Sequence, residues 1–485
     1  MGIAGRDMDT TTDVYPYLAF VMLFKLVIFV FEAFLDFRQY AKFKDMQVPA
    51  DIRGFVKEKV FKDSQAYNKD MKKFSIIKSF VDFVWEMASL YFLLLAFIWE
   101  YEAGIAYIGL DPTNEIYKAF FTFFCLYMIS TVMSIPWSLY SNFVIKQKHG
   151  FNTMTLKLFI TDLIKSSILV VILMAIVIPL IVKIIEWGGE HFYLYLFTFV
   201  VIFTFIMMWI VPNFIMPLFN KYEDVEEGDL KKKIYALADK LNFPLKKLFV
   251  VDHSQRSNHS NAYFFGFGSN KRIVLFDNLL KHLETDEIVA VVGHELGHWS
   301  MYHNLLNMII SFSSLFVTFY VFSFVIERDD ILIDFGFTKH YNLVALLVFM
   351  EIYSPVDYIQ NLIRTFITRI FEFQADRFAN DLGYKKELMK GLIRLHIKNK
   401  ANLNPDPLYA TYHFSHPELV ERLRALGDFH DIITSEELDK WEEEVKAKEE
   451  KEKVEKDKAT KEEEQSLLKE GEGESEEPTE KLKED

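Results

Sequence analysis

Seven long apolar segments run through this chain of 485 residues and restrict how it can fold. A hydrocarbon core about 30 Å thick takes roughly 20 apolar residues to cross as a helix, which satisfies its own backbone hydrogen bonds there. Aromatic residues make up 16% of the chain, more than a soluble domain usually carries. We therefore predict an all-α membrane part with seven transmembrane helices, at Tyr15–Ala33, Val84–Ile98, Ile116–Tyr140, Leu156–Ile184, Phe192–Leu218, Leu305–Ile326 and Leu343–Ile359.

Basic residues are concentrated in alternate loops. The loop at 34–82 holds eleven Lys and Arg residues, and the loop after the third span holds Lys146 and Lys148. The opposite loops, such as 327–334, are neutral or acidic. Because basic loops stay in the cytosol, we expect a multi-pass protein with a lumenal or external N-terminus and a cytosolic C-terminus. The first fourteen residues lack the basic start and cleavage site of a signal peptide, so we expect this segment to be kept.

Charged residues within the predicted spans need a physical reason. They are Glu86, Asp162, Lys165, Glu351 and Asp357. A charge at the middle of a bilayer is costly unless it faces protein or water. Some of these side chains can reach the interface along their aliphatic stems. Their number nevertheless favours a helical bundle with a hydrated interior over a tightly packed one.

The segment 286–302, DEIVAVVGHELGHWSMY, contains the pattern His-Glu-x-x-His. In a helix, His294 and His298 lie one turn apart on the same face and can share a zinc ion. Glu295 lies on the neighbouring flank, where it can take a proton from water that the metal has acidified. This arrangement predicts the general base of a metal-dependent hydrolase. Thr285 is expected to cap the helix.

Two histidines leave a catalytic zinc site incomplete, since three protein ligands and one open position are usual. Downstream, the helical stretch 365–382 places Glu372 and Asp376 on one face. Such a pair is more often an exposed helix face, but the two-histidine motif needs a carboxylate, so we expect Glu372 to be the third ligand. Asp376 can then accept the outer N–H of a ligand histidine. His303, five residues past the motif, should point away from the metal.

The zinc motif belongs to a small mixed segment at 220–304, on the cytosolic side. The pattern predicts a helix, a strand and a hairpin before the zinc helix, at 226–242, 247–251 and 261–277. An exposed edge from Asn261 to Phe265 can bind an extended peptide as an added strand. A hairpin that only braces the zinc helix fits the pattern equally well.

Two further regions lie toward the C-terminus. Pro417 fits the first turn of a helix, which places His416 in the preceding turn. There His416 can donate to an oxyanion, with a structural role as the alternative. The segment from Thr434 to Asp485 holds 22 Asp and Glu against 11 Lys, so it carries −11 of the formal net charge of −14. With almost no aromatic residues, this acidic tail is expected to be disordered or a single solvated helix.

Several stretches together resemble the Ste24-type CaaX prenyl proteases, a family of integral-membrane zinc metalloproteases. They are HELGHW, NAYFFGF with KRIVLFD, FEFQADRFA, PNFIMPLFNKY, and His416-Pro417 with Arg422. The resemblance extends to about Phe429. It implies transmembrane helices that enclose a chamber, with a small α+β gluzincin domain facing the cytosol. The acidic tail has no counterpart in the family pattern.

The resemblance also implies an activity and a location. The expected reaction removes the C-terminal tripeptide from CaaX proteins, in some members with a second upstream cut. The expected partners are farnesylated or geranylgeranylated CaaX proteins or peptides and membrane lipid, with no nucleic acid. The expected location is the endoplasmic reticulum membrane or the inner nuclear membrane.

The same resemblance implies roles for individual residues. One Zn²⁺ per chain would be held by three ligands, His294, His298 and Glu372, with Glu295 as the base. The substrate backbone would be held along the predicted edge, at Asn261, Ala262 and Tyr263. Two residues would lie near the tetrahedral intermediate or brace the site, His416 and Arg422.

The predicted organisation divides the chain into five parts. They are transmembrane helices one to five with the cytosolic loop 34–82, the zinc-protease segment, helices six and seven, the C-terminal part of the catalytic domain and the tail, at 1–219, 220–304, 305–360, 361–430 and 431–485.

Other functions share some of these features. A membrane quality-control metalloprotease would have the same zinc site but would need no prenyl group on its substrate. A non-catalytic channel, receptor or scaffold would use the metal as a clamp, but such a site is closed by a fourth ligand and needs no base like Glu295. An intramembrane site-2-type protease is disfavoured, because this motif lies between polar residues rather than inside an apolar span.

Overall fold

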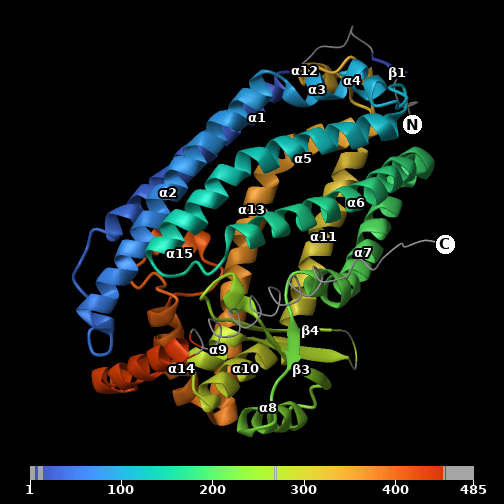
Figure 1. Ribbon diagram of the computed structural model, residues 1–485. Helices are drawn as coiled ribbons and strands as arrows, with labels where there is room; N and C mark the ends of the chain where they lie inside the picture. The colour runs from blue at the N-terminus through green and yellow to red at the C-terminus, as the bar shows by residue number, and fades with distance from the viewer. Residues whose placement is uncertain (1–5, 9–14, 267, 269, 452–453, 455–485) are drawn as a thin grey trace, which may run out of the picture. The chain divides into compact units, whose positions relative to one another are not determined.

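The structure is a computed structural model and describes residues 6–8, 15–266, 268, 270–451 and 454. The chain divides into two compact units, Met1–Ile432 and Ile433–Asp485. In the first unit, long helices lie on one side and a small sheet with shorter helices lies on the other (Figure 1). In the second unit, residues 435–451 are helical, but Leu438, Trp441 and Val445 are buried, so this part of the acidic tail is neither disordered nor the fully solvated helix that was expected. Residues 455–485 of the predicted tail lie outside the described residues.

Seven helices of 19 or more residues run through the described part of the first unit, and together we call them the membrane part. In chain order they are α1 (Tyr17–Lys42), α2 (Glu58–Tyr91), α5 (Glu115–Tyr140), α6 (Leu156–Gly188), α7 (Phe192–Ile210), α11 (His303–Ser323) and α13 (Asn342–Ala379). Within the described residues, five helical stretches are long and apolar enough to cross a membrane, or six if α2 and the next segment, bent by 60°, form one span. The fourth and fifth predicted spans fall in one such stretch, Leu156–Leu218. The membrane helices are thus confirmed, while seven separate spans and an enclosing chamber stay predictions.

Helical structure extends well beyond the predicted spans. Where a loop was expected at 34–82, α1 continues to Lys42 and α2 begins at Glu58, so only 43–57 connects them. Similarly, α13 joins the seventh predicted span and the stretch containing Glu372 in one continuous helix. Hydropathy identifies only the part of a helix that lies in lipid, whereas helix-forming polar residues prolong it on either side. The expected boundary between residues 360 and 361 therefore falls inside a helix.

Several charges in the apolar helices are paired across the fold. Lys25 of α1 lies 2.5 Å from a carboxylate oxygen of Glu86 in α2 and 3.0 Å from one of Glu351 in α13. Asp162 of α6 receives two hydrogen bonds from the guanidinium of Arg256, at 2.8 and 3.0 Å. Only 11–17% of the residues in the hydrophobic windows of four candidate spans are buried within the protein. Because surface that would face lipid also counts as exposed, a bundle with a hydrated interior stays a prediction.

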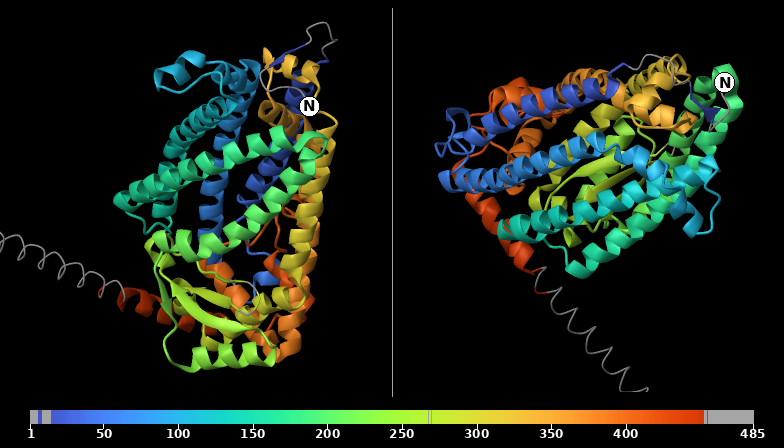
Figure 2. Two further views of the ribbon diagram at one scale, coloured as in Figure 1. Left: turned by 90° about the vertical axis from the view of Figure 1, so that its right-hand side faces the viewer. Right: turned by 90° about the horizontal axis from the view of Figure 1, so that it is seen from above.

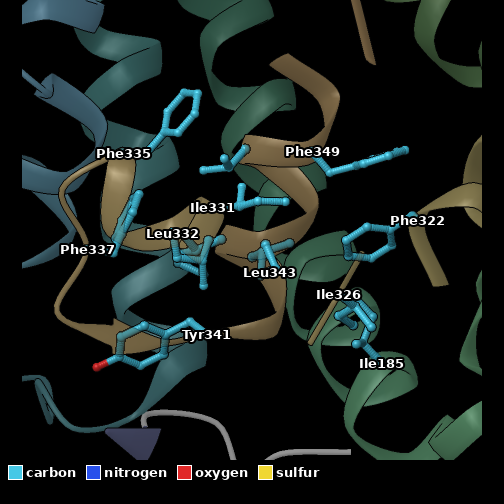
Figure 3. Packing of buried hydrophobic residues seen from close by; sticks show 14 of the residues in the cluster. Ile185, Phe322, Ile326, Ile331, Leu332, Phe335, Phe337, Tyr341, Leu343 and Phe349 are labelled. Atoms are coloured by element: carbon cyan, nitrogen blue, oxygen red, sulfur yellow. The ribbon is translucent and has the colours of Figure 1, made fainter. Parts of the chain in front are cut away.

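The main core of the membrane part lies at the ends of the long helices remote from the sheet (Figure 3). Three short helices lie there, α3 (Leu94–Trp99), α4 (Glu102–Tyr107) and α12 (Asp329–Asp334). The strands β1 (Arg6–Asp7) and β6 (Lys339–His340) form a two-stranded antiparallel sheet beside them. Phe322, Phe335 and Phe349 pack with the ends of α6, α11 and α13 in this core. Trp99 meets Tyr341 edge to face, with ring centroids 5.1 Å apart. This packing ties together helices that are sparsely buried elsewhere.

The sheet of the first unit, drawn as green arrows in the left view of Figure 2, has four strands in the order β2-β3-β5-β4. Its strands are β2 (Tyr222–Asp224), β3 (Leu245–Val251), β4 (Ala262–Phe265) and β5 (Lys271–Phe276). β3 and β5 are parallel, whereas β4 and β5 form the predicted hairpin. β4 is therefore an edge strand on the side away from β5, as the sequence pattern suggested for 261–265.

Helices cover one face of this sheet. They are α8 (Asp229–Lys240), α9 (Asp277–His282) and α10 (Thr285–Ser300). Beyond them, α14 (Lys385–Lys398) packs on α10, α16 (Leu419–Leu426) packs on α13 and α14, and α15 (Pro407–His413) packs on α1 and α13. The core between sheet and helices contains Ile234, Leu237, Leu248, Ile273, Leu275, Ile288, Val292 and Leu296. Because α10 is held by this core on one side and by α13 on the other, the His-Glu-x-x-His residues face α13.

Candidate metal centre

The N-cap of α10, the helix that carries the His-Glu-x-x-His motif, lies one residue before the predicted cap. The cap is Glu284 and not Thr285, because the side chains of Glu284 and Glu287 each accept from the backbone of the other. Arg394 of α14 donates to both carboxylates, at 2.7 and 2.8 Å. A carboxylate cap with a partner on a neighbouring helix satisfies the first-turn N–H groups and ties α10 to α14 at the same time.

Three side chains predicted as ligands meet at one point. The Nε2 atoms of His294 and His298 are 3.2 Å apart. Their distances to the nearest carboxylate oxygens of Glu372 are 3.5 and 3.4 Å. A tetrahedral zinc ion with bonds of about 2.1 Å has ligand atoms roughly 3.4 Å apart. The spacing of these three groups therefore matches the edges of such a coordination sphere.

The protonation pattern around these atoms also fits a cation. The outer nitrogen Nδ1 of His294 lies 2.9 Å from a carboxylate oxygen of Asp376, so in the neutral imidazole Nδ1 carries the proton and Nε2 presents a lone pair. Oε2 of Glu372 is buried and accepts no hydrogen bond within the described residues. Lone pairs converging on one point with no proton to share repel one another unless a cation lies between them. The donor set thus fits a metal ion held by two histidines and one carboxylate.

Asp376 and Arg422 form the outer support of His294. Arg422 donates to both oxygens of Asp376, at 2.8 and 2.6 Å, and both side chains are buried. Burial alone would favour a neutral Asp376, but the bidentate guanidinium keeps it ionised. The ionised carboxylate of Asp376 fixes the tautomer of His294. Asp376 and Glu372 are only 1% and 3% exposed to solvent. The alternative of a solvated helix face for this pair is therefore wrong.

His303 supports the second ligand, contrary to the expectation that it points away. Its Nδ1 lies 3.0 Å from Nδ1 of His298, and its Nε2 lies 2.9 Å from Oε1 of Gln374. Since Gln374 Oε1 can only accept, His303 carries its proton on Nε2 and its Nδ1 accepts from His298. His298 is thereby left with a lone pair on Nε2. The helical projection failed because α10 ends at Ser300 and Tyr302 adopts φ 59°, which turns the chain back.

Glu295 follows His294 on α10 and is the only motif residue that is not a candidate ligand. Burial raises the pKa of the Glu295 carboxyl above its usual value, although the neighbouring histidines act in the opposite sense. A carboxylate with a raised pKa is a better proton acceptor from water than an ordinary one. Its place beside the ligand cluster suits the predicted role of general base.

His416 lies at the open side of the cluster. Its Nε2 is 3.3 Å from Oε1 of Glu372, and its side chain is 62% exposed. Ser415 Oγ lies 3.0 Å from the other ring nitrogen. A half-open imidazole next to the ligand carboxylate can reach a substrate at the metal, which Arg422, buried behind Asp376, does not do. The two roles that the resemblance implies for His416 and Arg422, contact with the intermediate or support of the site, stay predictions.

The predicted substrate edge lies next to α10. The carbonyl of Asn261 accepts from the N–H of Phe276, so by alternation the backbone groups of Ala262 and Phe264 face the free edge of β4. The N–H of Ala262 donates to Oδ1 of Asn261, at 2.9 Å. Tyr263 lies 3.4 Å from the hydroxyl of Tyr222 and shares a cavity with His298. The edge and the metal centre are therefore neighbours.

Comparison with known proteins covers both parts of the first unit. Residues 38–221 match the CAAX prenyl protease N-terminal domain, which is described as five membrane helices. Residues 224–429 match peptidase family M48, and this match includes all the candidate ligands and supporting residues named above.

Individual relatives are similar over most of their length. The CAAX prenyl protease 1 homolog of Arabidopsis thaliana is 41% identical over 413 residues, covering 85% of this chain and 97% of the relative. CAAX prenyl protease 1 of Saccharomyces cerevisiae is 36% identical over 433 residues, covering 85% and 95%. The crystal structure of S. mikatae Ste24p matches with a TM-score of 0.81 and 35% identity, over 86% of this chain and all of that chain.

Proposed function

The chain belongs to the CAAX prenyl proteases of peptidase family M48, and from this premise we propose that it is a zinc endopeptidase that removes the C-terminal tripeptide from prenylated CaaX proteins. The observation that carries the proposal is the convergence of His294, His298 and Glu372 within 4.8 Å of one another, beside Glu295. The substrates we propose are farnesylated or geranylgeranylated proteins ending in CaaX. A second, upstream cut stays a prediction from the family resemblance.

The residues of the centre divide the work between them. Bound zinc supplies a positive charge that polarises the scissile carbonyl and acidifies water. His294, His298 and Glu372 hold it, and Glu295 takes the proton from the attacking water and passes it to the leaving amine. The products are a prenylated cysteine carboxylate and a free tripeptide.

Two residues beyond the ligands take separate parts. We assign His416 to the oxyanion. Its side chain is half-open to solvent, and its Nε2 lies next to Glu372, where it can donate to a substrate oxygen at the metal. Arg422 acts through Asp376. The ionised carboxylate of Asp376 keeps the proton of His294 on Nδ1 and leaves Nε2 free to bind the metal. Along the edge at Asn261, Ala262 and Tyr263, the outward backbone groups are those of Ala262, continued by Phe264, and they can pair with an extended substrate.

The proposed setting is a membrane of the endoplasmic reticulum or the inner nuclear membrane, with the metal centre toward the cytosol. The basic residues at 34–82 and near Lys148 support this orientation, since basic loops remain cytosolic. A prenylated C-terminus that reaches the membrane from the cytosol then meets the centre on its own side of the bilayer.

Paired peptides test the function. A farnesylated CaaX peptide and its unprenylated twin are incubated with the zinc-loaded wild-type protein and with Glu295→Gln, and tripeptide release is measured. We expect release from the farnesylated peptide with wild type and a loss of several orders of magnitude in Glu295→Gln with zinc retained. Equal cleavage of both peptides would instead indicate the quality-control protease, and no cleavage of either would refute the proposal.

A further inference from the structure

A cavity of about 840 Å³ opens directly beside the metal centre. His298 of α10 and Tyr263 of β4 form its wall on the side of the centre, while residues of α7 and α11 form the opposite wall. α7 and α11 pack against one another in the membrane part (Figure 1). Its volume lies within the range of about 300–1,000 Å³ in which proteins bind small ligands. We call it the α7–α11 cavity.

The lining of the α7–α11 cavity suits a flexible hydrocarbon. Its α7 and α11 walls are rich in methionine, including Met207, Met208 and Met308, and its other walls add aromatic rings. Thioether side chains have three rotatable bonds and adapt to irregular apolar ligands, and aromatic faces pack against unsaturated carbon chains. Among the described lining residues, Lys271 alone carries a fixed charge, and its ammonium donates to the carbonyl of Gly266 at 2.7 Å.

A second large cavity, of about 720 Å³, lies among α2, α5 and α13 and has a different character. Its lining includes Lys78, Asp82, Glu86 and Glu351, and it includes none of the candidate ligands. Burying a hydrocarbon against these charged groups would remove water from them at a cost. The second cavity is therefore the less favourable place for an apolar chain and is a useful comparison.

We propose that the α7–α11 cavity holds the isoprenoid chain of the substrate cysteine during cleavage. This inference rests on the proposed function, which places the scissile carbonyl at the metal. The prenylated cysteine directly precedes that bond, so its side chain must leave the backbone close to His298 and the edge of β4. Side chains of an extended strand project at right angles to its hydrogen bonds. The α7–α11 cavity, whose wall here is formed by Tyr263 and His298, is the apolar space next to that position.

The outer wall of the cavity also fits a lipid-bearing substrate. Met208 and Leu305, which line it, are 42% and 47% exposed on helices that are apolar enough to cross a membrane. A prenyl chain can therefore pass from the bilayer into the cavity without crossing water. Each methylene left exposed to water would lower the affinity for the substrate roughly fourfold. Specificity then follows from the length and bulk of the chain rather than from the side chains of the peptide.

Cavity-filling variants test the proposal against matched controls. Met208→Trp and Leu305→Trp add bulk inside the cavity, while Ile202→Trp and Ile309→Trp add it to equally exposed positions on the same helices that do not line it. Each variant is zinc-loaded, and kcat/KM is measured with geranylated, farnesylated and geranylgeranylated versions of one CaaX peptide. We expect the cavity variants to lose about tenfold or more on the longer chains and much less on the geranyl chain. The controls should keep the wild-type order.

Photo-crosslinking gives a readout that does not depend on turnover. A CaaX peptide whose isoprenoid carries a diazirine is bound to the zinc-loaded Glu295→Gln variant and irradiated, and the labelled segments are mapped by mass spectrometry. Labels within 203–216 or 304–308 support the proposal, whereas labels on α2 and α5 around the second cavity overturn it. An unchanged chain-length preference in both cavity variants, with wild type active, overturns it as well. A wild-type protein that cleaves no prenylated peptide would refute the proposed function instead.

Discussion

Replacing His303 by Phe tests the hydrogen-bond relay behind the second metal ligand. Phe keeps the stacked contact with Phe371, whose ring centroid lies 4.1 Å from that of His303 at 6°, but removes the acceptor for the Nδ1–H of His298. A buried donor left without a partner costs about 1–3 kcal/mol. That cost corresponds to roughly a 5- to 150-fold change in an equilibrium constant, in line with the 10- to 100-fold effects of lost outer hydrogen bonds on metal affinity.

The assay is the zinc dissociation constant of the purified protein, measured by competition with a chromogenic chelator. We expect weaker zinc binding by about 10- to 100-fold in His303→Phe. Gln374→Glu is the matched control, because a carboxylate still accepts from Nε2 of His303 and leaves its Nδ1 free to accept from His298. That variant should bind zinc at least as tightly as wild type. Wild-type zinc affinity in His303→Phe, with the protein folded, would refute the relay.

Three further perturbations address the ligand, the edge strand and the membrane helices. Glu372→Ala should lose stoichiometric zinc, while Asp376→Asn should weaken zinc affinity roughly 10- to 100-fold, both by metal analysis after dialysis; a fully loaded Glu372→Ala would identify another third ligand. Ala262→Pro removes an edge N–H and should raise KM for the farnesylated peptide with zinc content unchanged, so unaltered kinetics would argue against strand addition. Asp162→Leu leaves the partly buried Arg256 without its carboxylate partner, with only Asn220 still accepting from it, and should lower the midpoint of thermal unfolding in detergent, with recovery in Asp162→Arg/Arg256→Asp. Equal midpoints in all three proteins would show the pair to be dispensable.

The convergence of the three candidate ligands could be predicted from the sequence because each step used local geometry or ligand chemistry. The spacing of His294 and His298 needs only the helical repeat, and Glu372 follows from the need of two histidines for a carboxylate. The contact of His303 with His298 was not predicted, because a helical projection assumes that the helix continues, whereas the chain leaves the helix at Tyr302, which has a positive φ. No local signal in the sequence reports such a turn.

The membrane part shows the same limit of local patterns. Glu86 and Glu351 stood out as charges in apolar runs, but their partner, Lys25, lies in a span whose hydropathy hides a single lysine. Which charges meet depends on how α1, α2 and α13 pack, and this is a property of the assembled helices. The loop expected at 34–82 was mostly helical for a related reason, since a polar helix leaves no hydropathy signal.

The continuity of α13 makes the metal centre mechanically sensitive to the bilayer. At 1.5 Å per residue, its 38 residues form a rod roughly 57 Å long, with Glu372 roughly 25 Å beyond Pro355. A tilt of about 2° at Pro355 would move Glu372 by roughly 0.9 Å, more than the 0.5 Å or so within which a catalytic geometry must be held. Helices tilt when the hydrophobic thickness of the membrane changes. A helix that reaches from lipid to Glu372 would therefore carry a change in membrane thickness to the metal centre.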